Sequence, residues 1–293
     1  MARTEYKEPI QVRKQLDFGL RGDDVPKYWC GGDPFRTRLV DAVQATFPDG
    51  ERYFISSVMA FRNDVPNEDM LEEMRDFAKQ EGEHGRVHTD YNDRLARQGV
   101  NIGAFTKHTQ KLTQYRLKHY SRKYNVALTA ALEHFTAMLA DLFFAKKYVM
   151  EDADERVRAM LAWHAIEEME HKAVAFDVMQ KVAKVGYFQR CLAMTHATMT
   201  FTLFVLIAPW FMLKMDGLSV WQRVKAYGRG MGWMFGPRKG VFLRMLPAIA
   251  HYYRPGFHPN HLPTVHNYQA WLEGYGDDHD PIAAARAMHA AAV

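Results

Sequence analysis

Apolar residues recur at intervals of three and four from about Phe35 to Ala183, and few prolines interrupt them. This spacing places apolar side chains on one face of an α-helix, and the residues between them are good helix formers. We therefore predict an all-α fold in which residues 35–186 form a helical bundle. Residues 1–34, which contain a Gly-Gly-Asp-Pro run, are predicted to be an irregular N-terminal arm.

Capping and breaking residues predict where the helices of the first half begin and end. Pro48 and Gly50 are expected to end one helix and to start another, which carries Glu51 in its opening turn. Asn67, which two acidic residues follow, is predicted to cap a helix that runs to about Ala96.

The second half of the bundle is predicted to contain two further helices. Residues 101–124 have a helical pattern of their own and connect the halves, and residues 126–150 form an apolar helix. Asp152 or Asp154 is expected to cap the last helix, which is predicted to run without interruption to about residue 185.

The chain changes character after the predicted bundle. Residues 197–213 contain no charged residue, but three threonines dilute the apolar run and Pro209 interrupts it. This segment is either a helix at a membrane surface or a helix in the core or in a dimer interface. The basic and aromatic stretch that follows it, as far as residue 239, is compatible with a membrane surface. Residues 187–293 are thus predicted to be a C-terminal helical extension that packs on the bundle and ends in an irregular tail.

Two Glu-x-x-His pairs are the strongest chemical signal in the sequence. They are Glu81 with His84 and Glu168 with His171, and the chain contains no other pair of this kind. Residues i and i+3 project from the same face of a helix, so each helix offers a carboxylate and an imidazole together. Ligands of these two kinds suit iron, manganese and zinc.

One glutamate on each of two other helices completes the ligand set of a di-metal site. Glu51 and Glu133 give the chain the order Glu, Glu-x-x-His, Glu, Glu-x-x-His, which is typical of ferritin-like di-iron and di-manganese bundles. Among these four glutamates, the longest interval lies between Glu81 and Glu133, as expected for two helical hairpins joined by a crossover. We therefore predict a ferritin-like four-helix bundle with additional C-terminal helices, whose metal ligands are Glu51, Glu81, His84, Glu133, Glu168 and His171.

Other ionisable residues lie close to these positions along the helices. His88 follows His84 by one turn and His164 precedes Glu168 by one turn, so the two added histidines face each other if their helices are antiparallel. The sequence leaves four alternative roles for each of these two histidines: an additional ligand, a hydrogen-bond partner of the carboxylates, an acid/base group or an ordinary core histidine. Glu167 is the alternative to Glu168 as a ligand.

Three neighbouring residues are excluded from the predicted ligand set. Glu83, Glu170 and His134 project from other faces of their helices. Glu51 has an alternative role as a solvated acidic residue that stabilises a helix N-terminus. Glu133 lies among apolar neighbours, where an unpaired carboxylate would be costly, so a ligand role is favoured.

Charge and cysteine content narrow the range of partners and of cellular locations. The formal net charge is +4 and Lys and Arg are spread thinly, so nucleic acid is not an expected partner. Cys30 and Cys191 lie far apart without a Cys-x-x-Cys motif, which fits a reducing cytosol. The polar N-terminus lacks the apolar segment of a secretory signal, so a cytoplasmic protein is expected, with membrane association left open.

Three short segments carry a family resemblance: FPDGE at 47–51, QEGEH at 80–84 with His88 after it, and WHAIEEMEHK at 163–172. They resemble a bacterial family described as predicted metal-dependent hydrolases, within the ferritin-like superfamily. The resemblance spans about residues 35–185 and implies metal binding by the six ligands named above, with His88 and His164 close by. Histidines beside a di-iron core are also similar to those of N-oxygenases of aromatic amines.

The predicted function rests on this redox-capable set of ligands. The leading interpretation is a di-iron oxidase or oxygenase that activates O2 and oxidises a small aromatic or lipophilic substrate, with an electron donor as partner. The alternative is a metal-dependent hydrolase that uses a metal-bound hydroxide. Two Fe ions are the expected cofactors, with Mn or Zn as alternatives, and a homodimer is a further possibility.

Overall fold

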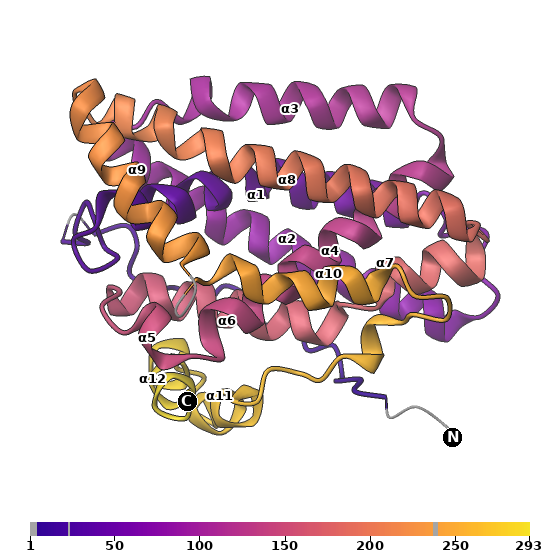
Figure 1. Ribbon diagram of the computed structural model, residues 1–293. Helices are drawn as coiled ribbons and strands as arrows, with labels where there is room; N and C mark the ends of the chain where they lie inside the picture. The colour runs from indigo at the N-terminus through magenta and orange to yellow at the C-terminus, as the bar shows by residue number, and fades with distance from the viewer. Residues whose placement is uncertain (1–4, 23, 237–239) are drawn as a thin grey trace.

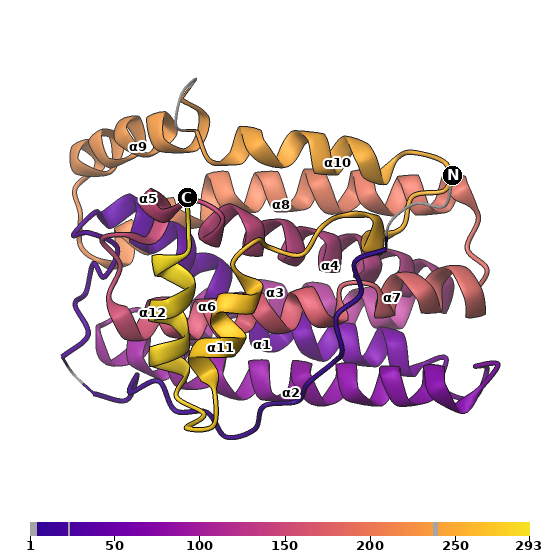
Figure 2. The ribbon, with the colours of Figure 1, turned by 90° about the horizontal axis from the view of Figure 1, so that it is seen from below.

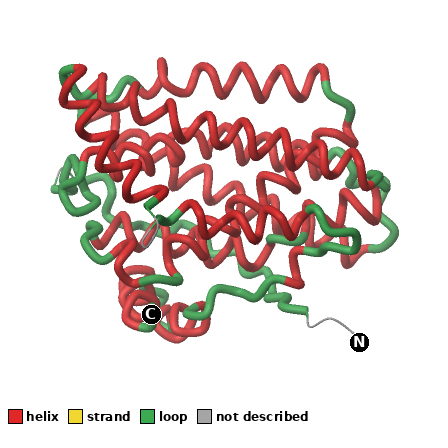
Figure 3. Tube along the Cα trace, in the orientation of Figure 1, coloured by secondary structure: helices red, strands yellow, loops and turns green. Residues whose placement is uncertain are grey.

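The computed structural model describes residues 5–22, 24–236 and 240–293, and every regular element within them is a helix (Figures 1 and 3). The predicted all-α fold class is therefore confirmed. The long helices are α1 (Pro34–Met59), α2 (Glu68–Arg97), α3 (Ile102–His119), α4 (Arg122–Phe144), α6 (Glu155–His171), α8 (Tyr187–Met215) and α9 (Val220–Phe235). The short ones are α5 (Lys147–Met150), α7 (Val174–Asp177), η1 (Val178–Val182), η2 (Phe242–Met245), α10 (Leu246–Tyr252), η3 (Pro259–His261), α11 (Tyr268–Tyr275) and α12 (Pro281–Ala290).

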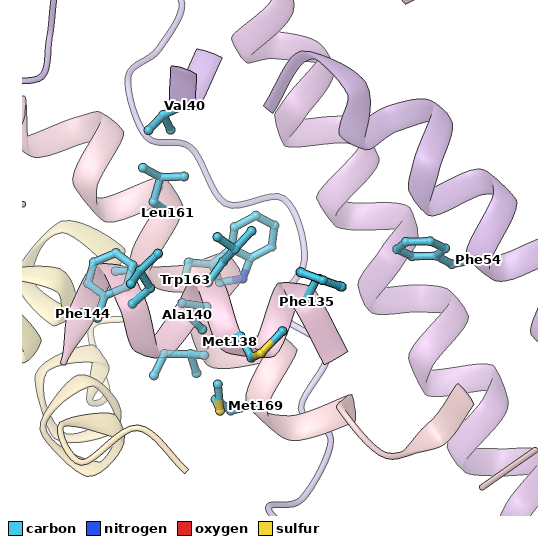
Figure 4. Packing of buried hydrophobic residues seen from close by; sticks show 14 of the residues in the cluster. Val40, Phe54, Phe135, Met138, Ala140, Phe144, Leu161, Trp163 and Met169 are labelled. Atoms are coloured by element: carbon cyan, nitrogen blue, oxygen red, sulfur yellow. The ribbon is translucent and has the colours of Figure 1, made fainter. Parts of the chain in front are cut away.

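Four helices, α1, α2, α4 and α6, surround a common interior. α1 packs along α2, α4 packs against α6, and α8 covers α1 and α4 from outside. Figure 2 shows the resulting order, with α2 on one side of the molecule and α8, α9 and α10 on the opposite side. The core between these layers is apolar, and Figure 4 shows part of it around Trp163, Leu161 and Phe144.

Capping residues begin the helices where the sequence predicts. The Asn67 side chain accepts a hydrogen bond from the Met70 amide at the start of α2, and Asp154 accepts from two amides at the start of α6. These bonds satisfy amide groups that the first turn of a helix leaves without partners. The predicted connecting helix of residues 101–124 is also present, as α3.

The break expected at Pro48 is wrong, because α1 continues through it to Met59. A proline inside a helix has no amide hydrogen and displaces the carbonyl groups one turn before it. The side-chain amide of Asn92, on α2, donates to the Ala45 carbonyl at 3.2 Å and so satisfies one acceptor at this position. Glu51 therefore lies well inside a long helix rather than in an opening turn.

The last helix of the bundle is not continuous, contrary to the prediction. α6 ends at His171, and a short α-helix and a π-helical turn follow it as far as Val182. The two residues between α6 and α7 keep right-handed helical backbone angles, so the chain direction is retained. A π-helical turn covers only a few residues, whereas hydrophobic periodicity is read over a longer window, so the sequence pattern does not reveal it.

The predicted irregular tail is also wrong, since α11 and α12 form a helical pair that packs on α6. Trp271 and Met288 are fully buried in this contact. The tail also shortens the predicted helix of residues 126–150, which ends at Phe144. The Asn267 side chain donates to the Phe144 carbonyl at 3.0 Å, and the Lys147 amide donates to the carbonyl of Val293.

A buried ionic cluster fixes α1 against α8. The Arg38 guanidinium donates to Asp41 at 2.6 Å and to Asp216, in the turn after α8, at 2.7 Å, and all three side chains are at most 1% exposed. Trp29 and Tyr91 also donate to Asp41. Buried charges are tolerated only when their partners remain in place.

We expect Asp216→Ala to lower the free energy of unfolding by about 3–5 kcal/mol, because Arg38 would keep its charge in the interior with only one acidic partner. Urea denaturation followed by circular dichroism measures this change. Asp76→Ala, which removes the partner of the exposed Lys79, is the matched control and should cost less than about 1 kcal/mol. Equal losses in the two variants would contradict the role of the cluster.

Candidate metal centre

The structure brings the six predicted ligands into one interior. Glu51 comes from α1, the first Glu-x-x-His pair from α2, Glu133 from α4 and the second pair from α6. None of the six is more than 3% exposed. The Nε2 atom of His171 lies 3.3 Å from Glu81, 3.4 Å from Glu133 and 3.4 Å from Glu168.

The two added histidines belong to the same interior and face each other, as the antiparallel arrangement requires. His88 Nε2 lies 2.6 Å from His164 Nδ1, and His164 Nε2 lies 2.8 Å from Glu168 Oε1. His88 Nε2 is also 3.7 Å from Glu51 Oε1. The ring of Phe47 contacts both imidazoles and bounds this end of the centre.

Donor atoms converge in four overlapping groups, and within each group they lie within 4.8 Å of one another. One group contains Glu81, Glu168 and His171, and another contains Glu51, His88 and His164. These two groups share no residue. His84 belongs to each of the other two groups, one with Glu51 and Glu81 and the other with His164 and Glu168.

Many donor atoms in this interior have no hydrogen-bond partner among the described residues. They comprise both carboxylate oxygens of three glutamates, one oxygen of a fourth and one ring nitrogen of each of three histidines. The residues concerned are Glu51, Glu81, Glu133, Glu168, His84, His88 and His171. Unpaired polar atoms are costly inside a protein, so their concentration at one point fits bound cations as the missing partners.

Neighbouring residues fix the orientation of two of the histidines. His171 Nδ1 lies 2.8 Å from Gln80 Oε1, and this bond leaves Nε2 directed at the carboxylates. His84 Nε2 lies 3.0 Å from Glu167 Oε2, and this bond leaves Nδ1 facing the interior, 3.8 Å from Glu168. Hydrogen bonds of this kind select the tautomer of a metal-binding histidine and raise its basicity.

Glu167, the alternative to Glu168, takes a different position. It belongs to none of the donor groups among the described residues and instead accepts from Arg13 of the N-terminal arm at 3.2 Å. Arg13 also binds Glu170 at 2.7 Å, so the arm covers this end of α6. Glu167 therefore orients His84, and Glu168 is the member of this pair that reaches the interior.

Two residues excluded by the helical faces point elsewhere, as expected. Glu83 lies near the surface and accepts hydrogen bonds from Gln15 and Arg86. His134 lies 3.1 Å from the Ala248 carbonyl, away from the donor groups. Gln80 and Arg13 were not identified from the sequence. Gln80 is the first residue of the segment at 80–84 but was given no role, and Arg13 reaches its partners across more than 150 residues and gives no local signal.

Burial and mutual repulsion determine the protonation of the carboxylates. Burial, together with the neighbouring carboxylates, raises the pKa of Glu51 and of Glu81 well above the usual range. Burial and the charge of Glu168 raise the pKa of Glu133 to about 7. Burial also opposes ionisation of Glu168, but His171 and His164 outweigh it and lower the pKa of Glu168. Without cations, the interior therefore retains protons.

Charge balance shows that the residues present fit a pair of divalent cations. Four carboxylates would carry four negative charges in an interior with no Lys or Arg in the donor groups of the described residues. Two divalent ions supply the same amount of positive charge and would replace the retained protons. Oxygen and imidazole nitrogen donors suit iron, manganese and zinc.

A small apolar pocket adjoins this centre. Its volume is about 50 Å³, and His164 and Glu168 form part of its wall. The rest of the wall is mainly aliphatic and aromatic, and Figure 4 shows three of its members, Val40, Leu161 and Phe144. The space next to the candidate metal ions therefore admits a small apolar group.

The chain belongs to a protein family described as "Predicted metal-dependent hydrolase", whose model matches residues 12–262. This match confirms the resemblance found in the sequence. Searches of curated proteins and of solved structures return no match. The family description and the donor groups support a metal-dependent enzyme, and the description favours the hydrolytic alternative over the oxidative interpretation.

Variants of the donor residues test the assignment of the ligands. We expect Glu133→Ala and His171→Ala each to bind metal at least about tenfold more weakly, because each removes a donor directed at the interior. Elemental analysis and titration with Fe(II) or Zn(II) measure the loss. Glu83→Ala is the matched control and should keep its metal, whereas the same metal content in all three variants would refute the assignment.

The pH dependence of stability tests the charge balance. Above about pH 7.5, the histidines of the unfolded chain are largely neutral, so the groups of this interior that still lose protons are those whose pKa is raised by folding. Glu51, Glu81, Glu133 and His171 are such groups. Their contribution to the stability of the metal-free protein is present at lower pH and is lost as pH rises through their folded-state pKa values.

We therefore expect the Tm of the metal-free protein to fall between about pH 7.5 and about pH 9. The metal-loaded protein should show little change over this interval, because cations stabilise the ionised carboxylates. Thermal denaturation of both forms provides the measurement. A metal-free protein that becomes more stable over this interval would contradict the raised pKa values.

Proposed function

We propose that this chain is a dinuclear metal enzyme that uses O2 to oxidise a small apolar or aromatic substrate. The observation that carries the proposal is the contact between the apolar pocket and two residues of the centre, His164 and Glu168. Two iron ions fit the carboxylate and histidine donors, and an external electron donor would supply the reducing equivalents. When bound, such ions would supply electrons to O2 in steps.

Residues of the chain have defined roles in this proposal. The four carboxylates, His84 and His171 hold the ions, while Gln80 and Glu167 orient these two histidines. The apolar wall binds the substrate and excludes bulk water. His164 can donate a proton from Nε2 to Glu168 and accept one at Nδ1 from His88. The hydrogen-bonded row of His88, His164 and Glu168 can therefore move protons at the edge of the pocket.

The polarity of the pocket supports oxidation over hydrolysis. Hydrolysis of an ester or an amide develops a negatively charged oxygen that hydrogen-bond donors or the metal ions must stabilise, and without such donors the metal ions would have to do so alone. Apart from the centre itself, the polar side chains of the wall are Gln44 and Thr136, and the Thr136 hydroxyl already donates to the Glu133 carbonyl. An apolar wall instead suits a substrate without ionic groups.

Hydrolysis is the second candidate, and the description of the family favours it. Zinc or manganese at the same donors would activate water, as in other metal-dependent hydrolases. The two reactions differ in their need for O2 and for a redox-active metal. They can therefore be separated by one comparison on the same purified protein.

That comparison uses protein loaded anaerobically with Fe(II) and protein loaded with Zn(II). O2 uptake by the iron form, stimulated by toluene or aniline, together with no cleavage of nitrophenyl esters by either form, would support oxidation. Ester cleavage that persists without O2 in the zinc form, with no O2 uptake by the iron form, would overturn oxidation and establish hydrolysis.

A variant that fills the pocket tests the proposed substrate site. Ala140 lines the pocket, and we expect Ala140→Leu to weaken the binding of toluene or aniline at least about tenfold through steric exclusion. Metal content should be unchanged. Ala137→Leu is the matched control, because Ala137 lies on the same helix but faces a separate cavity of about 250 Å³. Isothermal titration calorimetry measures binding, and unaffected binding by Ala140→Leu would place the substrate elsewhere.

A further inference from the structure

Helix α8 exposes a continuous apolar stripe. Phe188 is 86% exposed, Met199 67% and Leu203 59%, and Leu192, Ile207 and Phe211 continue the same face. These residues follow one another at intervals of four or seven, so they lie along one side of the helix. Monomeric soluble proteins rarely expose contiguous apolar surface of this extent unless it binds a partner or a membrane.

Helix α9 extends this surface with aromatic and cationic side chains. Trp221 is 65% exposed and Val224 44%, and the Lys225 ammonium lies 5.4 Å from the centre of the Trp221 ring. Figure 1 shows α9 beside one end of α8. We call the exposed face of these two helices the α8–α9 surface. Its mixture of aromatic and basic groups is typical of helices that lie in the headgroup region of a membrane.

The segment that contains α8 and α9 carries a large excess of positive charge. Residues 178–272 contain eleven Lys and Arg but one acidic residue, Asp216. Asp216 is turned inward and binds Arg38, so it does not neutralise the surface. Lys214, Lys225 and Arg229 are exposed, and none of them is paired with an acidic side chain in the described part of the chain. Arg238 and Lys239, which also belong to the basic stretch, lie outside the described residues.

Within the described part of the chain, two helices, α4 and α8, are long and apolar enough to cross a membrane by length and composition alone. The most apolar part of α4 is 72% buried, as in an ordinary core helix, whereas that of α8 is only 28% buried. One side of α8 packs on α1 and α4, which carry donor residues of the metal centre. A helix with one side fixed to a folded bundle and the other side exposed fits a position in the plane of a membrane surface.

We propose that the α8–α9 surface docks this protein on a membrane that contains anionic lipids. The apolar stripe of α8 enters the boundary between headgroups and acyl chains, and Lys214, Lys225 and Arg229 bind the anionic headgroups. Charge complementarity selects a lipid surface over a second copy of the chain, because two copies would bring unpaired cations toward each other. The docking stands on the exposed surface and does not depend on the reaction at the metal centre.

The same surface lies close to the apolar pocket. Phe201 of α8 and Phe242 of η2 form part of the pocket wall. An apolar substrate dissolved in the bilayer would therefore reach the centre over a short path. This consequence rests on the proposed function, whereas the docking itself does not.

Sedimentation of the full-length, metal-loaded protein with lipid vesicles tests the docking. We expect strong binding to vesicles of phosphatidylcholine with phosphatidylglycerol, and weaker binding to phosphatidylcholine alone or at high salt. Lys214→Glu with Lys225→Glu should lower the partition coefficient at least about 20-fold. Lys79→Glu on α2, at the opposite side of the molecule, makes the same type of substitution and should leave binding within about twofold.

A second pair of substitutions tests the apolar contribution. Leu203→Gln with Phe211→Gln should weaken vesicle binding at least about tenfold and leave metal content and thermal stability unchanged, because both side chains are exposed. Light scattering of the protein without vesicles tests whether a second copy of the chain occupies this surface instead. No binding to anionic vesicles, or a dimer that Leu203→Gln with Phe211→Gln dissociates, would overturn the proposal. Failure of the oxidation experiment would leave it intact.

Discussion

Four carboxylates share one water-poor interior, and the surrounding structure is arranged to keep them there. Helices α1, α2, α4 and α6 each contribute one of them. Bringing several negative charges into a low-dielectric interior is unfavourable unless positive charge accompanies them. The described chain directs no Lys or Arg at the donor groups, and its nearby cation, Arg13, is engaged by Glu167 and Glu170. Divalent cations are therefore the partners that complete this interior.

Much of the centre could be predicted because helical geometry is local. The i and i+3 positions of Glu81 with His84 and of Glu168 with His171 share a helix face whatever the tertiary structure. The inward position of Glu133 followed from its apolar neighbours. The facing of His88 and His164 needed one further assumption, the antiparallel course of two helices, and the structure agrees with it.

The features that could not be predicted depend on contacts between distant segments. α1 continues through Pro48, where Asn92 on another helix donates to the Ala45 carbonyl. α4 ends at Phe144 because Asn267 competes for its carbonyl group. Arg13 reaches Glu167 from the N-terminal arm. Each of these interactions overrides a local preference, and none has a signature in the nearby sequence.

The fold links a charged interior to an apolar exterior across the thickness of one helical layer. α1 and α4 carry donor residues on one side, and α8 packs on their other side and exposes its own apolar stripe. The small pocket lies between these layers, with α8 contributing Phe201 to its wall. The reaction at the metal centre and the docking of α8 on a membrane are therefore separate properties of the same helical layers. The family description favours hydrolysis, and the apolar pocket supports oxidation.

The number of metal ions bound per chain tests the central claim most directly. It is measured by elemental analysis of the purified protein after anaerobic incubation with excess Fe(II), Mn(II) or Zn(II) and removal of unbound ions. We predict two tightly bound ions per chain for at least one of these metals, because two divalent ions would balance the four buried carboxylates. A protein that retains none of the three metals and stays folded would contradict the account, because its four buried carboxylates would then need no cations.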